Sequence, residues 1–283
     1  MLDRFLIDKY VLSALEEDIG FGDITTDNLA TNDDFLEAKL NTRSDGIVCG
    51  LKVFERVFKN LSEDVEIKFH FKDGDIIKVG DTIANLKGSA SAILKGERTA
   101  LNFAQRMSGI ATETRKYQDA IGEGLKARIS DTRKTTPNFR VFEKYAVYVG
   151  GASIHRFNLA DCAMIKDNHI KLAGSLTKAV EKIRKNISHT HKIEVECDIL
   201  DQVKEALACG VDIIMLDNMS CKTMKKAVEI INGRAIIEAS GNVNLSTVHA
   251  IAEVGVDIIS SSAIVAKAPT LDLALDMWWC YEM

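Results

Sequence analysis

Short apolar runs, each followed by a helical pattern, occupy residues 126–262 and restrict the choice of fold more than any other feature of the sequence. The six runs are KARIS, CAMIK, KIEVE, VDIIMLD, AIIEAS and VDIISSS. Helical patterns such as LTKAVEKIRKN and CKTMKKAVEIIN separate them, and glycine stands near several of the helix ends. Because strands joined by helices usually run parallel, this alternation predicts a parallel α/β sheet.

Polar residues that can take part in chemistry follow or end almost every run. They are Asp131, Arg133, Lys166, Asp167, Glu196, Asp198, Asp217, Asn218, Glu238, Ser240 and Ser260–Ser262. In a barrel of parallel strands the C-terminal ends meet at one mouth, where catalytic groups lie. A doubly wound sheet would normally carry a glycine-rich turn after its first strand, and none follows here. Six strands are fewer than the eight of a complete barrel, so we expect an incomplete or irregular α/β barrel.

The residues before about position 112 show a different pattern. An amphipathic helix is expected at the start, followed by segments of alternating polarity with Asp-Gly and Gly-Asp turns, which predict antiparallel strands. From Leu94 to Ile121, helical spacing indicates one long helix or two in series. We therefore expect an N-terminal domain over residues 1–112 and a barrel over residues 113–268, with the tail 269–283 packing back on the first domain.

Composition excludes several classes of protein. A net charge of −5 argues against nucleic acid as the main partner. No apolar run approaches the roughly 18 residues of a membrane span. The six cysteines form no C-x-x-C pair, so neither a zinc site nor a disulfide framework is indicated, and a reducing cytoplasm fits best. The segment DGDIIKVGDTIANLKG resembles half of a lipoyl-type barrel but lacks an exposed lysine at a hairpin tip, so we interpret it as structural.

Cations and anions are both expected at the mouth of the barrel. The cations are Arg133, Lys134, Arg156, Lys166 and Lys171, and the anions are Glu196 and Asp217. Cations that share a cavity repel one another unless they bind a multiply charged anion, and arginine suits carboxylate or phosphate. Paired carboxylates hold Mg²⁺ directly or through water, beside substrate phosphates. The polar segments Ser240–Asn242 and Ser260–Ala263 follow late strands, where barrels often bind phosphate.

Each of these residues also has a purely structural interpretation. A single lysine or arginine near a strand end is most often a solvated charge. Asp131 can cap the next helix, and His155 can be a core histidine with satisfied hydrogen bonds. Glu196 and Asp217 can pair with lysines at the rim. The recurrence of polar residues at successive strand ends favours a functional site over surface decoration.

The longer motifs resemble those of the quinolinate phosphoribosyltransferase family, also called nicotinate-nucleotide pyrophosphorylases. They are EEDIGFGDITT, ERTALNFAQRMSGIAT, DTRKTTPNFR, KYAVYVGGASIHRFNLADCAMIKDNH, IEVECD, MLDNMS, EASGNV and GVDIISSSAI. The resemblance implies a type II phosphoribosyltransferase fold, with an N-terminal open α/β sandwich and an incomplete, TIM-like α/β barrel. It also implies transfer of phosphoribosyl from 5-phosphoribosyl 1-pyrophosphate to quinolinate with Mg²⁺, giving nicotinate mononucleotide, pyrophosphate and CO₂ in NAD biosynthesis.

The same resemblance assigns residues to roles. Those expected to line the quinolinate pocket are Thr132, Arg133, Lys134, His155, Arg156 and Lys166. Glu196 and Asp217 are expected to face the ribose and Mg²⁺, and catalysis is assigned to these two carboxylates with Lys134 and Lys166. The expected phosphate-binding residues are Ser240, Gly241, Asn242, Ser261, Ser262 and Ala263. Many relatives have glycine where Asn138 stands here, and asparagine tolerates similar backbone angles.

The family also implies a homodimer, or a hexamer built from such dimers, in which Arg98 reaches the quinolinate site of the neighbouring subunit. Two alternatives remain at this point. One is a paralogous family of the same fold associated with molybdenum transport. The run of cationic and histidine side chains argues against it, because it favours a pocket for a dicarboxylate; these are Arg133, Lys134, His155, Arg156 and Lys166. The other is an aldolase that uses Lys166 as a Schiff-base lysine, activated by the cations around it.

Overall fold

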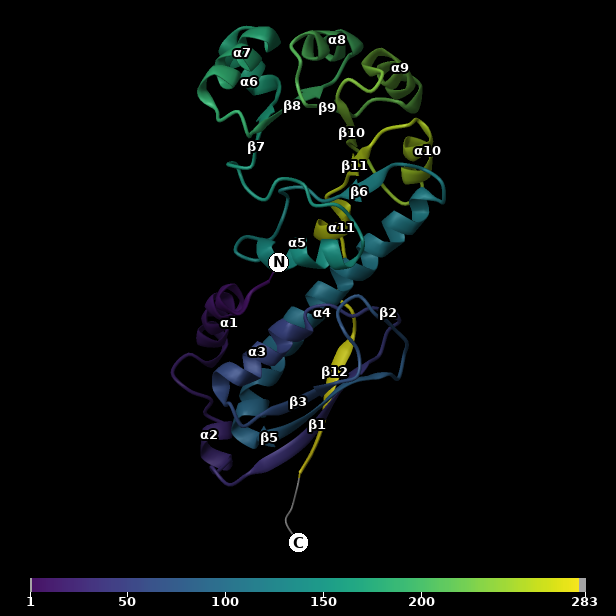
Figure 1. Cartoon of the computed structure of the whole chain (residues 1–283). Helices are drawn as coiled ribbons and strands as arrows, with labels where there is room; N and C mark the ends of the chain where they lie inside the picture. Colours follow the sequence, from purple (N-terminus) through teal and green to yellow (C-terminus); the bar gives the residue numbers. More distant parts are fainter. Residues whose placement is uncertain (1, 280–283) are drawn as a thin grey trace. The chain divides into compact units, whose positions relative to one another are not determined.

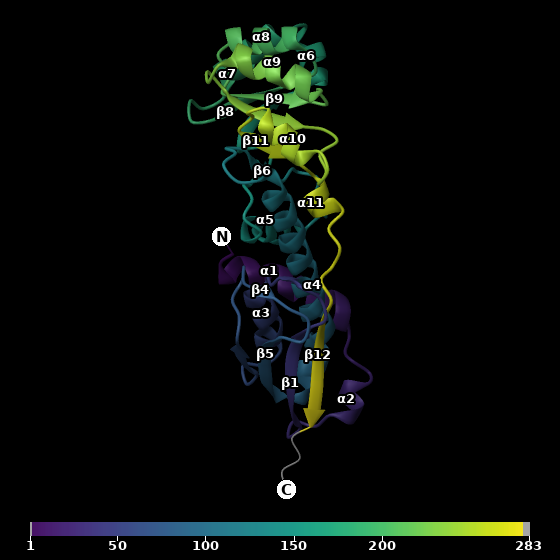
Figure 2. The same cartoon turned by 90° about the vertical axis from the view of Figure 1, so that its right-hand side faces the viewer.

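The structure is a computed structural model that describes residues 2–279 (Figures 1 and 2). The chain divides into two compact units. The N-terminal unit contains Glu113 and the residues before it, Pro137–Gly150, and Ala268 and the residues after it. The barrel unit contains Thr114–Thr136 and Gly151–Lys267. Cys280 and the other residues of the tail up to position 283 lie outside the described residues.

The N-terminal unit is an open α/β sandwich around a four-stranded antiparallel sheet, in the order β12, β1, β5, β3. Its strands are β1 (Phe35–Thr42), β3 (Glu66–Phe69), β5 (Thr82–Ser89) and β12 (Leu273–Trp279), and β2 (Gly46–Ile47) pairs with β4 (Ile76–Ile77). Its helices are α1 (Arg4–Ile19), α2 (Thr26–Leu29), α3 (Leu51–Leu61), α5 (Arg140–Val149) and most of α4 (Ala90–Ile121). Leu36, Ala38 and Leu40 of β1 are buried in alternation, as expected when one face of a sheet is packed.

The segment Pro137–Gly150 differs from its expected place, because it belongs to the N-terminal unit although the sequence pattern assigned it to the barrel. Helix α5 buries Phe142 fully, and the ring of Phe142 packs edge-on against Tyr10 and Phe103. The Arg106 guanidinium of α4 also donates to the buried Glu143 carboxylate at 3.0 Å. Aromatic packing and a buried ion pair, neither visible in the local pattern, therefore decide where α5 lies.

The barrel unit is built on six parallel strands in the order β6, β11, β10, β9, β8, β7. They are β6 (Arg128–Ser130), β7 (Cys162–Ile165), β8 (Lys192–Cys197), β9 (Ile213–Asp217), β10 (Ile236–Ser240) and β11 (Ile258–Ser260). The helices are α6 (Asp167–Ala173), α7 (Leu176–Asn186), α8 (Leu200–Ala208), α9 (Cys221–Ile231), α10 (Val248–Glu253) and α11 (Ala263–Ala266). All six predicted strands are present, and no ladder joins β6 to β7 among the described residues, so the barrel is incomplete.

The two faces of this sheet differ in polarity. The side chains that point outward are apolar and buried, and helices α6–α10 lie outside the strands in Figure 1. They are Ile129, Ile165, Ile193, Val195, Ile214, Leu216, Ile237, Ala239 and Ile259. The positions between them carry polar or sulfur-containing side chains such as Met164, Glu194, Met215 and Glu238. Parallel strands are usually apolar on both faces, so the polar side chains on the inner face of this barrel indicate a functional site.

Close packing between α4 and the chain after Pro269 provides a test of the N-terminal unit. A Cβ at Gly109 would lie 1.9 Å from the Pro269 carbonyl oxygen, so Gly109→Ala must push these segments apart. We expect destabilisation of about 1–3 kcal/mol. The exposed Asn102→Ala on the same helix should change stability by less than about 0.5 kcal/mol. Thermal unfolding midpoints check this, and equal midpoints for the two variants would contradict the packing.

Candidate active site

A cavity of about 710 Å³ opens at the C-terminal ends of the parallel strands. Every predicted site residue except Arg98 and Lys171 lines it, and Lys171 instead pairs with Asp167 at 2.9 Å. The residues that were predicted are Thr132, Arg133, Lys134, His155, Arg156, Lys166, Glu196, Asp217, Ser240, Gly241, Asn242, Ser261, Ser262 and Ala263. Ser260 of the predicted phosphate-binding segment also lines it, as do Asn218 and Glu238, which were expected at strand ends without a role. The residues that were not expected there are Met164, Met215, Val243 and Lys267. Arg98 is exposed on α4 in the N-terminal unit and is not among the lining residues.

Lys166 and Glu196 come from neighbouring strands and meet in this cavity. Lys166 immediately follows β7 and is the N-cap residue of α6, and its ammonium contacts a carboxylate oxygen of Glu196 on β8. The Glu196 side chain is 18% exposed and that of Lys166 is 44% exposed, so the pair lies at the boundary with solvent. Lys166 is therefore paired with an acid, whereas the aldolase alternative relied on neighbouring cations to activate it.

Arg156 is held from two sides. Its Nη1 donates to the Cys162 carbonyl oxygen at 3.0 Å, and its Nη2 lies 3.5 Å from the Met164 sulfur. Neither contact is with a charged group, so the guanidinium can still bind an anion in the cavity. Its charge also acts on Glu194, whose pKa it lowers against the larger effect of burial.

Asp217, Asn218 and Asn242 form a hydrogen-bonded chain at the mouth. The Asn218 side-chain amide donates to Asp217 at 2.7 Å, and Asn242 donates to the Asn218 side-chain oxygen at 3.1 Å. Asn218 and Asn242 have φ values of 53° and 52°. Gly241, which precedes Asn242 in the loop after β10, has φ 90°. A Cβ at Gly241 would lie 2.2 Å from the Asn218 side-chain oxygen, so only glycine leaves this chain in place.

Asp131 does not serve as the helix cap considered above. Its carboxylate is fully buried and accepts from the backbone N–H of His155 at 2.8 Å. It therefore ties the strand end of β6 to the loop that carries His155 and Arg156. Asn138 has φ 62°, the left-handed conformation expected where relatives carry glycine.

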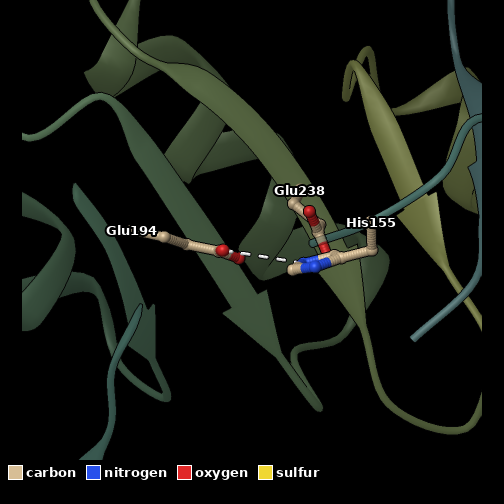
Figure 3. Close-up of side chains that lie close together, drawn as sticks. All are labelled: His155, Glu194 and Glu238. Atoms are coloured by element: carbon tan, nitrogen blue, oxygen red, sulfur yellow. Dashed lines mark ion pairs between the residues drawn. The ribbon is translucent and has the colours of Figure 1, made fainter. Parts of the chain in front are cut away.

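A buried cluster lies beneath the mouth, formed by His155, Glu194 and Glu238 (Figure 3). The Nε2 atom of His155 is 3.5 Å from Glu194 and 3.3 Å from Glu238. Both glutamates are almost completely buried, at 1% and 4% exposure. The pKa of Glu194 is raised, chiefly because burial disfavours its charge.

The protonation state of His155 depends on both of its nitrogens. Burial lowers the pKa of His155, but the nearby carboxylates of Glu194 and Glu238 outweigh it and favour a pKa of about 10. The backbone N–H of Arg156, however, points at Nδ1 from 2.7 Å. A second proton at Nδ1 would face that N–H directly, so the contact favours the neutral ring with its proton on Nε2.

The cluster was missed in part because Glu194 lies in the middle of a strand. Glu238 was noted near a strand end but received no role. A signal was present, since Glu194 precedes Glu196 by two residues and Glu238 precedes Ser240 by two. Side chains two residues apart on a strand share a face, so all four had to point into the barrel.

Another cavity of about 770 Å³ lies outside the barrel mouth and differs in charge. Its ionisable residues are Lys126, Arg234, Asp212, Glu229 and Asp257, so it offers no excess of cations. We therefore place the candidate site at the mouth, where the cations and the strand-end carboxylates meet.

Comparison with known proteins identifies the family. The model of the quinolinate phosphoribosyl transferase N-terminal domain matches residues 23–108, and that of the C-terminal domain matches residues 110–276. The chain belongs to the quinolinate phosphoribosyltransferase family. A probable nicotinate-nucleotide pyrophosphorylase [carboxylating] of Synechocystis is 44% identical, over 96% of this chain and 92% of the relative. The corresponding Bacillus subtilis protein is 41% identical, over 92% of this chain and 90% of its own.

Solved structures agree with this assignment. The crystal structure of NadC from Streptococcus pyogenes superposes with a TM-score of 0.95 at 40% identity, over 99% of each chain. The nicotinate-nucleotide pyrophosphorylase from Ehrlichia chaffeensis gives a TM-score of 0.92 at 42% identity, over 98% of this chain and all of that one. The expected sandwich and incomplete barrel are thus confirmed as the family's fold. Among the described residues, no helix is both long and apolar enough to cross a membrane.

The close approach of Gly241 to Asn218 predicts that a side chain at position 241 weakens ligand binding at the mouth. Gly241→Ala should displace Asn218 and the Asp217 carboxylate, and weaken binding of inorganic pyrophosphate on the order of tenfold. Gly233→Ala is the matched control, because Gly233 also has a positive φ of 72° but a Cβ there meets nothing within 4 Å. Calorimetric titration measures both affinities. Equal affinities in the two variants would show that Asn218 does not organise the site.

Proposed function

We propose that the mouth of the barrel binds quinolinate beside 5-phosphoribosyl 1-pyrophosphate and joins them with loss of CO₂. The products are nicotinate mononucleotide, pyrophosphate and CO₂. The observation that carries this proposal is the composition of one cavity, in which Arg133, Lys134, Arg156, Lys166 and Lys267 surround two strand-end carboxylates. A dicarboxylate and a polyphosphate together supply the negative charge that such a set of cations requires.

Quinolinate carries two adjacent carboxylates, and the cations that approach from the loops after β6 and β7 suit them. Arg133, Arg156 and Lys166 hold the carboxylates, and Lys134 and His155 complete the pocket with Thr132. Fixing both carboxylates orients the ring nitrogen toward the sugar. Part of the binding energy is thus used to align the two reacting atoms. The guanidinium of Arg156 is suited to this role because its hydrogen bonds go to uncharged atoms of Cys162 and Met164.

The phosphorylated sugar is assigned to the other side of the cavity. The loops Ser240–Asn242 and Ser261–Ala263 offer hydroxyl and backbone N–H donors to phosphate. Glu196 and Asp217 are hard oxygen donors in the same cavity, and each uses one oxygen for Lys166 or Asn218. They fit Mg²⁺ as direct or water-mediated partners beside substrate phosphates. Bound there, Mg²⁺ would neutralise charge on the departing pyrophosphate.

The chemistry begins with departure of pyrophosphate from C1 of the ribose, which leaves positive charge on the sugar ring. Glu196 and Asp217 stabilise that charge, and Lys134 and Lys166 offset the negative charge of the substrates. The quinolinate nitrogen donates its electron pair to C1 and becomes a pyridinium. The neighbouring C2–carboxylate bond then breaks, releasing CO₂ and leaving its electron pair at C2, where a proton completes nicotinate mononucleotide.

The alternatives make different predictions in one assay. Purified protein is supplied with Mg²⁺, 5-phosphoribosyl 1-pyrophosphate and either quinolinate or nicotinate, and nucleotide and CO₂ are followed. Turnover with quinolinate alone supports the decarboxylating transferase. No turnover with either substrate would favour the molybdenum-associated relatives of the same fold. An adduct trapped by borohydride at Lys166 with a carbonyl substrate would favour the aldolase, which the contact between Lys166 and Glu196 disfavours.

Arg156→Ala should raise the KM for quinolinate far more than that for 5-phosphoribosyl 1-pyrophosphate, by on the order of a hundredfold against about threefold. The reason is that the guanidinium is assigned to a carboxylate of quinolinate alone. Steady-state kinetics with each substrate varied in turn measures the difference.

Arg184→Ala is the matched control for that experiment. Arg184 likewise donates to backbone carbonyl oxygens, those of Cys209 and Gly210, but it is not among the residues that line the mouth. It should leave both KM values unchanged. Equal increases for both substrates in Arg156→Ala would contradict the proposed role of Arg156.

The active assembly is proposed to be a homodimer, or a hexamer of dimers, in which Arg98 completes the neighbour's site. The support is that Arg98 stands in the ERT motif and is exposed on α4. Mixing inactive Arg98→Ala and Lys166→Ala subunits should restore up to about a quarter of the activity, because a shared interface recreates some intact sites. Mixtures that stay inactive after subunit exchange would show that each site is formed by one chain.

A further inference from the structure

Glu194 and Glu238 are buried acids that no step of the proposed reaction uses. Both point into the barrel beneath the mouth, from β8 and β10, and both face the Nε2 atom of His155 (Figure 3). Burying two carboxylates this close together is costly unless they serve a partner. A third cavity, of about 640 Å³, reaches the same three residues from the N-terminal ends of the strands. Apolar packing therefore does not explain why these acids stand here.

A metal ion is the first alternative, because one ligand atom of each residue lies within 4.8 Å of the others. The hydrogen bond at the other ring nitrogen argues against it. A histidine that binds metal through Nε2 carries its proton on Nδ1 and donates that proton to an acceptor. Here Nδ1 faces a donor, the Arg156 N–H, so the proton belongs on Nε2, between the two carboxylates.

The same hydrogen bond links the carboxylates to the substrate pocket. Glu194 and Glu238 lie 3.5 Å and 3.3 Å from Nε2, at ion-pair distance and without a hydrogen bond to these oxygens, and they hold the imidazole ring between them. Nδ1 of that ring then accepts from the Arg156 backbone, while the Asp131 carboxylate holds the His155 backbone. The orientation of the ring thus determines where the Arg156 side chain begins. Arg156 lies in a loop rather than in a strand, so no ladder hydrogen bond replaces this support.

We propose that Glu194 and Glu238 are positioning residues that orient His155 and, through its Nδ1, the Arg156 guanidinium that binds a carboxylate of the substrate. This inference rests on the proposed function, because it assigns Arg156 to quinolinate. It extends the site to Glu194 below the mouth and gives a positioning role to Glu238, which lines the mouth. It also requires an oxygen that faces Nε2 at each position, whereas a role in charge balance alone would require a negative charge.

The test compares alanine and glutamine at both positions. Glu238→Ala and Glu194→Ala should each raise the KM and the Kd for quinolinate on the order of tenfold, because a freed ring lets Arg156 shift. The KM for 5-phosphoribosyl 1-pyrophosphate should change by no more than about twofold. Glu238→Gln and Glu194→Gln keep an oxygen that can face Nε2 and should restore most of the affinity.

Nitrogen NMR of the histidines supplies a readout that does not depend on turnover, with His155→Gln used to assign the signal. The unsubstituted protein should show a protonated Nε2 and an unprotonated Nδ1 at His155. In the alanine variants, exchange between tautomers or a proton on Nδ1 is expected. The glutamine variants should keep the original tautomer, and they serve as the test if an alanine variant does not fold.

Glu205 provides the control. Its carboxylate accepts from the backbone and hydroxyl of Thr177, away from the barrel interior, so Glu205→Ala should affect stability without changing either KM. The inference is overturned if both KM values rise together, if glutamine fails to rescue, or if the unsubstituted protein holds a stoichiometric divalent metal that Glu238→Ala loses. Absence of quinolinate turnover in the unsubstituted protein would instead refute the proposed function.

Discussion

The alternation of side chains along six parallel strands is the constraint on which the rest of the barrel depends. Every second residue is apolar and lies beneath the surrounding helices, as Ile165, Val195 and Leu216 do. The positions between them must then face inward, including Glu194, Glu196 and Asp217. A shift of one residue would exchange the two sets, bury charge under the helices and remove the site. Stability and function therefore select the same register.

Strands and loops contribute side chains of different charge to the inner face of the barrel. The strands contribute carboxylates at fixed positions, whereas most of the cations come from the segment between β6 and β7, where no ladder closes the barrel. Loop residues lack the ladder hydrogen bonds that hold a strand in place, and buried carboxylates hold them instead. Asp131 holds the backbone of His155, and Glu194 and Glu238 face its ring. The incomplete barrel thus leaves room for the cation-bearing segment and anchors that segment from inside.

Much of the barrel could be predicted because its signals are local. The helix expected at LTKAVEKIRKN runs from Leu176 to Asn186, and each predicted strand is present. The place of α5 could not be predicted, because it depends on contacts of Phe142 and Glu143 with residues distant in sequence. The predicted cations and strand-end acids converge, but the link from Glu238 through His155 to Arg156 depends on tertiary distances that no spacing encodes. The roles assigned by resemblance remain predictions.

A crystal structure of the protein with quinolinate bound tests the central claim most directly. The account predicts that the ligand occupies the mouth, with its two carboxylates on Arg133, Arg156 and Lys166 and its ring nitrogen turned toward Glu196 and Asp217. The His155 ring should keep its contacts with both buried glutamates. Quinolinate bound at another cavity, or bound at the mouth with Arg156 turned away from both carboxylates, would contradict the account.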